Sequence, residues 1–401
     1  MTKTTKLEKI ETGSASFGAF HDRPSVEELM ARARAMIPTL RARGQKADEA
    51  RRISDQTVAE FIEAGFHLIG QPIRFGGYGY GQDVICEVST EISRGDGTAG
   101  WLACFFAAHN LIIGLFPEQG QNEVWGEGSP VLCSTISTAG LVAYDKVDGG
   151  IRVNGKVRFS SGIDVANWVI IIGNSGLILI PKRDYRIEDD WFVMGMKGSG
   201  SKAVVLENVF VPDRRIVSPE SLGTYQTYGA KHYEAIHYRL PFAVWSTTNQ
   251  TSVILGMAQG LLDLFDERIR GRKDPHTTQP AIERPGWQLR FAEAAAEVDA
   301  ARALFRSVHD DFQAWHARGG DVSAEERSRV RRNIVFTTKL CVQAANRLFD
   351  GGDASVIYES NAIQRFFRDI RTAAVSISQV WDEPAIQYSR VHWGLPQQTM
   401  F

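Results

Sequence analysis

The chain has 401 residues, which is enough for two or three domains that each bury a core of their own. Its hydrophobic fraction of 43% is that of an ordinary globular protein, and a formal net charge of −2 gives no electrostatic attraction to nucleic acid or anionic membranes. No window approaches the roughly 20 apolar residues that span a bilayer, and the polar N-terminus lacks the apolar stretch of a secretory signal. The four cysteines show no CxxC spacing. We therefore expect a cytoplasmic protein with free thiols and no metal site.

Residues 1–130 have the pattern of a helical domain. Ser25, followed by Glu28, predicts a capped helix start, because the serine can accept hydrogen bonds from free amides while the glutamate reaches back. Further helices are expected at 54–64, from 84 onward and at 101–115, with a glycine-rich loop at 72–81.

The period changes toward two between Val131 and Val217, which predicts a small, barrel-like β-domain over 131–230. Gly149-Gly150 and Asn154-Gly155 are expected to form tight turns, since both pairs tolerate positive φ. Strands are expected at 168–172, 177–180 and 203–211.

Helical periodicity returns from about Ser252 and fills a C-terminal domain over 231–401. Apolar stripes predict four helices, near 257–265, 289–315, 330–348 and 363–381, and hence a bundle. The sequence thus predicts an α+β protein in which a helical domain, a β-domain and a four-helix bundle follow one another.

Common catalytic motifs do not explain the chain. It has no P-loop, no GxSxG, no HExxH and no GxGxxG that opens a helix. The segment GMKGSGS at 195–201 is rich in small residues, but it lies between β-type runs and is weak support for phosphate binding when taken alone.

Five stretches, taken together and in order, resemble the acyl-CoA dehydrogenase superfamily. Within it the chain is most similar to the two-component (group D) monooxygenases, which use reduced flavin to oxygenate phenols, indoles, other heteroarenes and amines. The stretches are PIRFGGYG (72–79), FPEQGQNEVWG (116–126), NGKVRFSSGIDVANWVIIIG (154–173), WFVMGMKGSGSKAVVLENVFVPDRRIV (191–217) and QRFFRDIRTA (364–373).

The resemblance implies a flavin site. A flavin needs hydrogen-bond partners around N5 and the pyrimidine edge. In the family a serine of the FSSG segment faces N5, so this role falls to Ser160 or Ser161, with Trp168 as an aromatic wall. Ser134 and Thr135 hold the positions of hydroxyls under the isoalloxazine ring. From the residues alone, a strand-end turn and ordinary strand hydroxyls are the alternatives.

We expect arginine side chains to bind the flavin phosphate. The resemblance implies that Arg270 or Arg272 contacts the phosphate, often across a subunit boundary, and guanidinium geometry suits this role. Either arginine could instead complement the dipole at a helix end. Gln364 and Arg368 correspond to a late flavin-contacting segment, although Arg368 and Asp369 could equally form a structural ion pair.

His109 is the candidate for proton chemistry. A histidine on an apolar helix is often a satisfied core residue. Here it coincides with a family position that faces substrate and flavin, and imidazole titrates near neutral pH. Trp101 and Asn110 are expected to line the same substrate pocket.

A missing carboxylate separates oxygenase from dehydrogenase. In the commonest dehydrogenase arrangement a glutamate base occupies the position of Ile377, and 372–381 contain no acid. The second arrangement places the base near the start of the first bundle helix, where 245–256 contain none either. We therefore predict a monooxygenase that acts with O2 through a flavin C4a-hydroperoxide, protected in a dry pocket. An acyl-CoA dehydrogenase-type flavin oxidoreductase is the alternative, and a non-catalytic flavin-storage protein is a third.

The substrate is expected to be aromatic. Phenol hydroxylases of the family carry a histidine at the position of Ser376, and His392 lies too far along to replace it. We therefore expect Ser376 to be a catalytic residue or to line the pocket, and we expect an electron-rich substrate that needs no phenolate, such as an indole, another heteroarene or a thioether. The resemblance further implies reduced FAD, with FMN as the alternative, delivered by a separate flavin reductase to a homotetramer.

Overall fold

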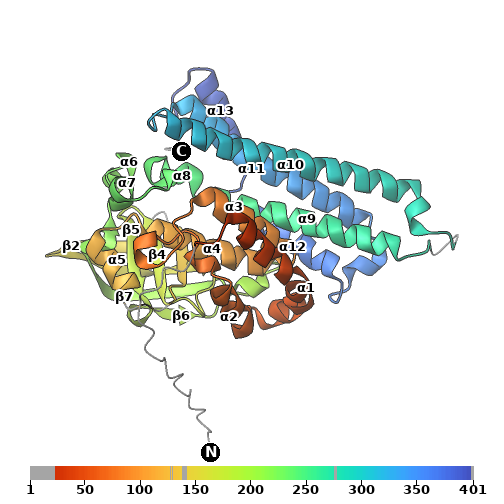
Figure 1. The fold of residues 1–401 in the computed structure, drawn as a ribbon, viewed down its shortest axis with the longest axis horizontal. Helices are drawn as coiled ribbons and strands as arrows, with labels where there is room; N and C mark the ends of the chain where they lie inside the picture. The colour runs from red at the N-terminus through yellow and green to blue at the C-terminus, as the bar shows by residue number, and fades with distance from the viewer. Residues whose placement is uncertain (1–22, 127, 129, 138–141, 275–277, 399–401) are drawn as a thin grey trace, which may run out of the picture.

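The computed structural model describes residues 23–126, 128, 130–137, 142–274 and 278–398, with the backbone alone for 135–137. The strands gather at one end, the long C-terminal helices extend away from them, and the N-terminal helices lie between (Figure 1). This order confirms the predicted α+β architecture.

The N-terminal helices begin where the sequence predicts. Ser25 accepts from the Glu28 amide and the Glu28 side chain returns a hydrogen bond, so the expected capping box is confirmed. The helices are α1 (Val26–Ala50), α2 (Asp55–Glu63), α3 (Gln82–Ser93), α4 (Gly97–Ile113) and α5 (Glu118–Trp125).

Helix α4 is the centre of the molecule. Every one of its residues is buried, and it packs against α3, β1 and the first bundle helix. Its sequence is apolar around the whole circumference, as a helix surrounded by protein requires. Side chains on α4 therefore face α3, the bundle or the β-strands, with little exposure to bulk water.

The strands form two four-stranded sheets, with orders β1-β4-β5-β8 and β2-β3-β7-β6. Strands β1 and β4 run parallel, and the remaining neighbours are antiparallel. Their bounds are β1 Cys133–Ser137, β2 Val142–Val147, β3 Gly150–Ser160, β4 Trp168–Gly173, β5 Gly176–Pro181, β6 Arg186–Glu188, β7 Lys202–Pro212 and β8 Ile216–Val217.

The sheet that contains β4 and β5 is buried on both faces. Val169 and Ile171 pack in the core between the two sheets, whereas Trp168 and Ile170 pack in the large core shared with the helices. This explains why both strands are almost uninterrupted apolar runs.

One predicted turn is wrong. Gly149 forms the β2–β3 turn as expected, with φ of 70°. Asn154 and Gly155 instead lie inside β3, at a shift in its pairing with β7. The Asn154 side chain accepts from the Asn208 amide (2.7 Å), so the pair forms an irregularity within the sheet.

The C-terminal half is a helical bundle. Three of the four expected helices are confirmed, and the last ends at Ala374 rather than 381. The reason is tertiary, because the buried Gln379 amide binds the Thr247 carbonyl (3.1 Å) and the Thr251 hydroxyl (2.9 Å) and turns the chain toward α9. The helices are α6 (Pro219–Gly223), α7 (Tyr228–His232), α8 (Phe242–Trp245), α9 (Thr248–Arg270), α10 (Pro285–Ala317), α11 (Ala324–Asp350), α12 (Ala362–Ala374) and α13 (Asp382–His392). Among the described helices, none has the length and hydrophobicity to cross a membrane.

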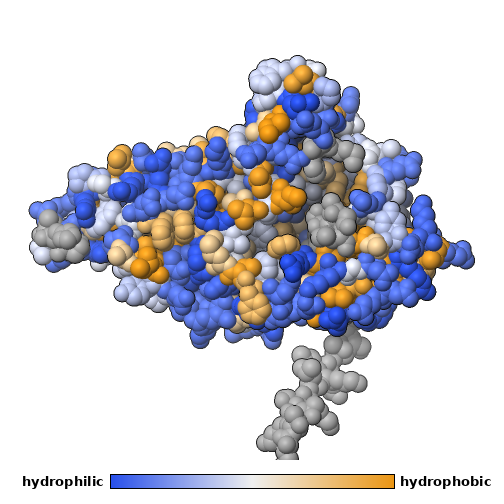
Figure 2. All heavy atoms as spheres, turned by 180° about the vertical axis from the view of Figure 1, so that it is seen from behind, coloured by the Kyte–Doolittle hydropathy of each residue, from blue (hydrophilic) through white to orange (hydrophobic). Residues whose placement is uncertain are grey.

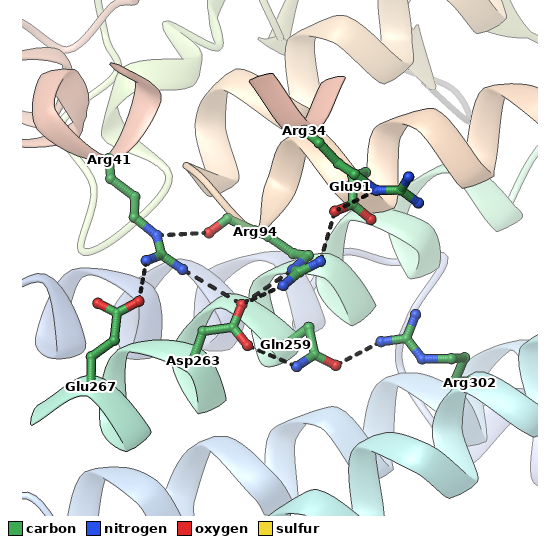
Figure 3. Close-up of polar contacts among 8 residues, drawn as sticks. All are labelled: Arg34, Arg41, Glu91, Arg94, Gln259, Asp263, Glu267 and Arg302. Atoms are coloured by element: carbon green, nitrogen blue, oxygen red, sulfur yellow. Dashed lines mark hydrogen bonds and ion pairs between the residues drawn. The ribbon is translucent and has the colours of Figure 1, made fainter. Parts of the chain in front are cut away.

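Ion pairs clamp the N-terminal helices onto the bundle (Figure 3). Asp263 on α9 accepts from Arg94 (2.9 Å) and lies 3.5 Å from Arg41. Gln259, one turn earlier, donates to Asp263 and accepts from Arg302 of α10. The network therefore joins α1, α3, α9 and α10.

Some large hydrophobic side chains are exposed in the single chain. Phe159, Phe192 and Ile377 expose 67%, 74% and 84% of their surface, which is unusual for such residues. Figure 2 shows hydrophobic patches on the face behind that of Figure 1. Such surface is a candidate for contact with a further group or chain.

Candidate functional site

An aromatic stack on α4 forms one wall of the candidate site. Trp101, Phe105 and His109 follow one another at helical spacing, with ring centroids 4.8 and 5.1 Å apart. All three are buried. Because α4 is enclosed by protein, this wall has little exposure to solvent.

A group of hydroxyls lies against the stack, and we call Ser134, Ser160, Ser161, Ser199 and Ser201 the serine cluster. The Trp101 indole donates to the Ser161 hydroxyl (3.0 Å), and Ser134 donates to the Ser161 carbonyl (2.8 Å). Ser201 lies 2.8 Å from Ser161 and 2.7 Å from Ser199. The cluster thus joins β1, the end of β3 and the GMKGSGS segment.

The direction of these hydrogen bonds follows from one proton per hydroxyl. Ser199 donates to the Met196 carbonyl (2.7 Å), so Ser201 must donate to Ser199, and Ser161 must donate to Ser201. The Ser161 proton is therefore used within the protein. Ser160 differs, because its hydroxyl is fully buried and has no partner among the described residues.

His109 is neutral at physiological pH. Burial lowers the pKa of its imidazole to about 4, and Nδ1 contacts the Cys133 carbonyl of β1. That contact requires the proton on Nδ1 and leaves Nε2 as an acceptor. His109 can therefore accept a hydrogen bond in the site, but it is not an acid near neutral pH.

Comparisons with known proteins give the family. The model of the acyl-CoA dehydrogenase C-terminal domain matches residues 249–379. The flavin-dependent monooxygenase oxygenase subunit HsaA of Rhodococcus jostii is 33% identical, with 92% of this chain and 98% of the relative covered. The oxygenase component of an FADH2-dependent resorcinol hydroxylase from a Rhizobium species is 30% identical, with 92% and 94% covered. The crystal structure of a Rhodococcus 3-HSA hydroxylase matches with a TM-score of 0.87 at 32% identity, over 93% and 98% of the two chains. The chain belongs to the oxygenase components of flavin-dependent monooxygenases.

The residues present fit the flavin that this family uses. An unpartnered, buried hydroxyl such as Ser160 costs stability unless a ligand completes it. Next to it in the chain, the Ser161 carbonyl accepts from Ser134 and the Ser161 hydroxyl accepts from Trp101, so the backbone that follows Ser160 is tied to β1 and to the aromatic wall. A planar, polar-edged ring system suits such a hydroxyl-lined cradle beside an aromatic wall.

The α12 candidates, Gln364 and Arg368, use their polar groups within the chain. Arg368 donates to Gln364 (2.6 Å), to the Met194 carbonyl and to Asp48 (3.0 Å). The ion-pair partner of Arg368 is therefore Asp48, and the suggested pair with Asp369 is not formed. Asp369 instead accepts from the Met196 amide.

Arg270 and Arg272 are not brought to the serine cluster in one chain. Arg270 is exposed and pairs with Asp266, and Arg272 pairs with Asp353. Both lie where α9 ends, at the end of the bundle remote from the strands (Figure 1).

The remaining predicted residues have different surroundings. The side-chain nitrogen of Asn110 donates to three backbone carbonyls, and its oxygen accepts from the Trp125 indole, so the side chain has a structural role. Trp168 is buried under the Arg215 guanidinium, 5.3 Å from its ring. Ser376 is half-buried in the turn after α12, 3.5 Å from the Ser378 hydroxyl. Thr135 belongs to β1, but its side chain is outside the described part.

Sequence reasoning missed Ser199, Ser201 and the role of Asp369. The glycines of the GMKGSGS segment suggest phosphate binding, but its two serines form the contacts: Ser201 bonds to Ser161, and Ser199 bonds to Ser201. Their spacing of two residues, next to a second serine-rich strand end, was the available signal.

Proposed function

We propose that the chain receives reduced flavin from a separate reductase and transfers one oxygen atom of O2 to an aromatic or heteroaromatic substrate such as an indole. The observation that carries this proposal is the buried Ser160 hydroxyl, which has no partner among the described residues and belongs to the last residue of a strand whose next residue, Ser161, bonds to Trp101 of the Trp101–His109 wall. Reduced flavin, when bound, supplies the electrons that activate O2, and the second oxygen atom leaves as water.

The protein's own residues would hold and shield the reacting groups. We assign the N5 edge of the flavin to Ser160, because its hydroxyl has no partner among the described residues, whereas that of Ser161 already bonds to Trp101 and Ser201. Trp101, Phe105 and neutral His109 exclude water on one side, which protects an activated oxygen species from elimination. His109 Nε2 can accept a hydrogen bond from the substrate.

We propose that the flavin phosphate is held by Arg270 or Arg272 of a second chain within a homotetramer. In one chain the two arginines lie remote from the serine cluster (Figure 1), and exposed Phe159 and Phe192 offer surface for a partner. FAD is preferred to FMN, since a relative at 30% identity is named for FADH2.

The preferred substrate class rests on Ser376. A serine hydroxyl is a poor base for a phenolic proton, which favours an indole-like ring that needs no deprotonation. A phenol is the second candidate, because the relative from Rhizobium is named a resorcinol hydroxylase.

The test supplies the purified chain with a flavin reductase, NADH, 18O2 and either indole or resorcinol. We expect one labelled oxygen atom in the product, with indole preferred, and no turnover without reductase. Resorcinol preferred over indole would overturn the substrate assignment. Hydrogen peroxide as the only product with both compounds, or anaerobic reduction of a dye by an acyl-CoA, would count against an oxygenase.

A further inference from the structure

A carboxyl group on α12 is connected to the serine cluster by hydrogen bonds. Asp369 is 1% exposed, and its Oδ1 accepts from the amide of Met196 in the GMKGSGS segment. Met196 has a φ of 55°, a left-handed conformation that is unfavourable for a non-glycine residue. An additional interaction is needed to keep it there, and the Asp369 carboxyl provides one.

Further hydrogen bonds connect Met196 to Ser161 in the serine cluster. The Met196 carbonyl accepts from Ser199, Ser199 accepts from Ser201, and Ser201 accepts from Ser161. We call Met196, Ser199, Ser201 and Ser161 the hydroxyl relay. Each hydroxyl has one proton, so fixing the Met196 carbonyl fixes the direction of every later bond.

Two indole groups flank this relay. The Trp191 indole donates to the Met196 carbonyl (3.3 Å), and the Trp101 indole donates to Ser161 (3.0 Å). Each end of the relay therefore carries one indole N–H that senses the orientation of its acceptor.

The loop can reach Asp369 only because residue 195 is glycine. A Cβ at Gly195 would lie 2.3 Å from the Arg368 carbonyl, so any side chain would push the loop away from α12. This close approach brings the amide of the next residue, Met196, onto the carboxyl.

The surroundings of Asp369 are unusually acidic. Burial and the carboxylates of Asp96 and Asp48 raise the pKa of Asp369 to about 7, whereas the Met196 amide and Arg365 lower it. Other charged groups are engaged nearby: Arg365 lies 3.7 Å from Asp96, and Arg368 and Lys197 lie 3.0 and 3.8 Å from Asp48.

We propose that Asp369 is a positioning residue that sets the orientation of Ser161 through the hydroxyl relay, and that this makes the flavin cradle sensitive to pH near neutrality. A carboxylate holds the Met196 amide by a charge-assisted hydrogen bond, and a neutral carboxyl holds it more weakly. The relay is therefore tight above neutral pH and looser below it. Only the effect of the hydroxyl relay on flavin binding rests on the proposed function.

The test uses the full chain without flavin. Indole N–H groups are labelled with 15N and followed by NMR from pH 5.5 to 8.5, with tryptophan-to-phenylalanine variants for assignment. We expect the signals of Trp191 and Trp101 to shift together with a midpoint near pH 7. Trp125, whose indole binds Asn110 outside the relay (2.9 Å), should not follow.

Variants separate the steps. Asp369→Asn keeps an acceptor without a titrating group, so both inflections should vanish. Asp190→Asn is the matched control, because Asp190 also accepts a backbone amide, that of Ala203 (3.0 Å), yet does not touch the relay. Ser201→Ala should abolish the response of Trp101 and leave that of Trp191.

The proposal is overturned if the inflections persist in Asp369→Asn, or if Trp101 still responds in Ser201→Ala. Should Asp369→Asn not fold, the wild type and Ser201→Ala decide the question alone.

Flavin affinity gives a second readout. We expect the Kd of wild type for FAD to be about fivefold lower at pH 8 than at pH 6, the scale by which a charge-assisted hydrogen bond exceeds a neutral one. The Kd of Asp369→Asn should not change with pH, and an unchanged Kd in wild type would contradict the link to flavin. The indole signals need neither flavin nor turnover, so failure of the oxygenase assignment would leave them unaffected.

Discussion

The indole nitrogen of Trp101 donates to the hydroxyl of Ser161 over 3.0 Å, across 60 residues of sequence. This bond ties the buried wall on α4 to the end of β3. Since the same hydroxyl also donates to Ser201, Ser161 forms hydrogen bonds within the protein both as acceptor and as donor. The neighbouring Ser160 is left as the hydroxyl that a ligand can engage.

Trp101→Phe should loosen this junction while keeping the aromatic wall. Removal of one buried donor is expected to cost about 1 kcal/mol of stability in urea unfolding. Loss of the fixed cradle should raise the fraction of NADH that ends as hydrogen peroxide. Trp125→Phe is the control, because it removes an equally buried indole bond, to Asn110, outside the site. Equal peroxide release by both variants would contradict the role of Trp101.

Ser160→Ala and Ser161→Ala should separate function from stability. The Ser160 hydroxyl has no hydrogen-bond partner among the described residues, so without flavin its alanine variant should unfold at an unchanged or higher urea midpoint yet lose at least about tenfold in kcat/KM, or ~1.4 kcal/mol. Ser161→Ala leaves Trp101 and Ser201 without their partner and should cost roughly 1–3 kcal/mol of stability. Normal oxygenation by a stable Ser160→Ala variant would refute the assignment of Ser160.

Asp369 should make stability depend on pH. Its folded pKa of about 7 lies above the ordinary value of 3.8, so between these values the folded chain holds a proton that the unfolded chain has lost. This contribution to stability is therefore present at acid pH and falls as pH rises toward 7. Asp369→Asn has no such loss, so its stability relative to wild type should rise by roughly 2–4 kcal/mol between pH 4.5 and 8. A pH-independent difference would argue that Asp369 does not titrate in this range.

The folded protein is thus less stable when Asp369 is ionised, which is the state that tightens the hydroxyl relay, than when Asp369 is protonated. Such a conflict is common where a site needs a group that the fold alone would not choose.

The sequence predicts the order of helices and strands better than it predicts the contacts of the candidate flavin site. Caps such as Ser25 and the continuous apolar runs of β4 and β5 are local signals, and both were read correctly. The end of α12 at Ala374 depends on Gln379 binding to α9, which no local pattern reveals. The same holds for Asp369, whose partner amide lies 173 residues away in sequence.

A site shared between chains can be tested by complementation. If Ser160 of one chain and Arg272 of another serve one flavin, Ser160→Ala and Arg272→Ala should each be inactive alone. Coexpressed chains should regain activity at roughly a quarter of the sites, because random pairing combines two intact halves in a closed oligomer. Arg347→Ala replaces Arg272→Ala in the control mixture, since Arg347 forms an ion pair within its own chain with Glu297 (2.8 Å). That variant should be active alone, and no recovery in the test mixture would place each flavin within one chain.

The ion-pair clamp between the N-terminal helices and the bundle should contribute measurably to stability. Asp263 is about one-fifth exposed and receives hydrogen bonds from Arg94 and Gln259, so Asp263→Asn removes one of the two carboxylates that pair with Arg94 and leaves Glu91 as the other (Figure 3). We expect a loss of roughly 1–3 kcal/mol in urea unfolding, since a broken buried pair costs more than an exposed one. Asp266→Asn, on the same helix, removes only the exposed pair with Arg270 and should cost less than about 0.5 kcal/mol. Similar losses in both variants would mean that burial does not strengthen the Asp263 network, and α1 and α3 would then be held mainly by their apolar contacts with α9.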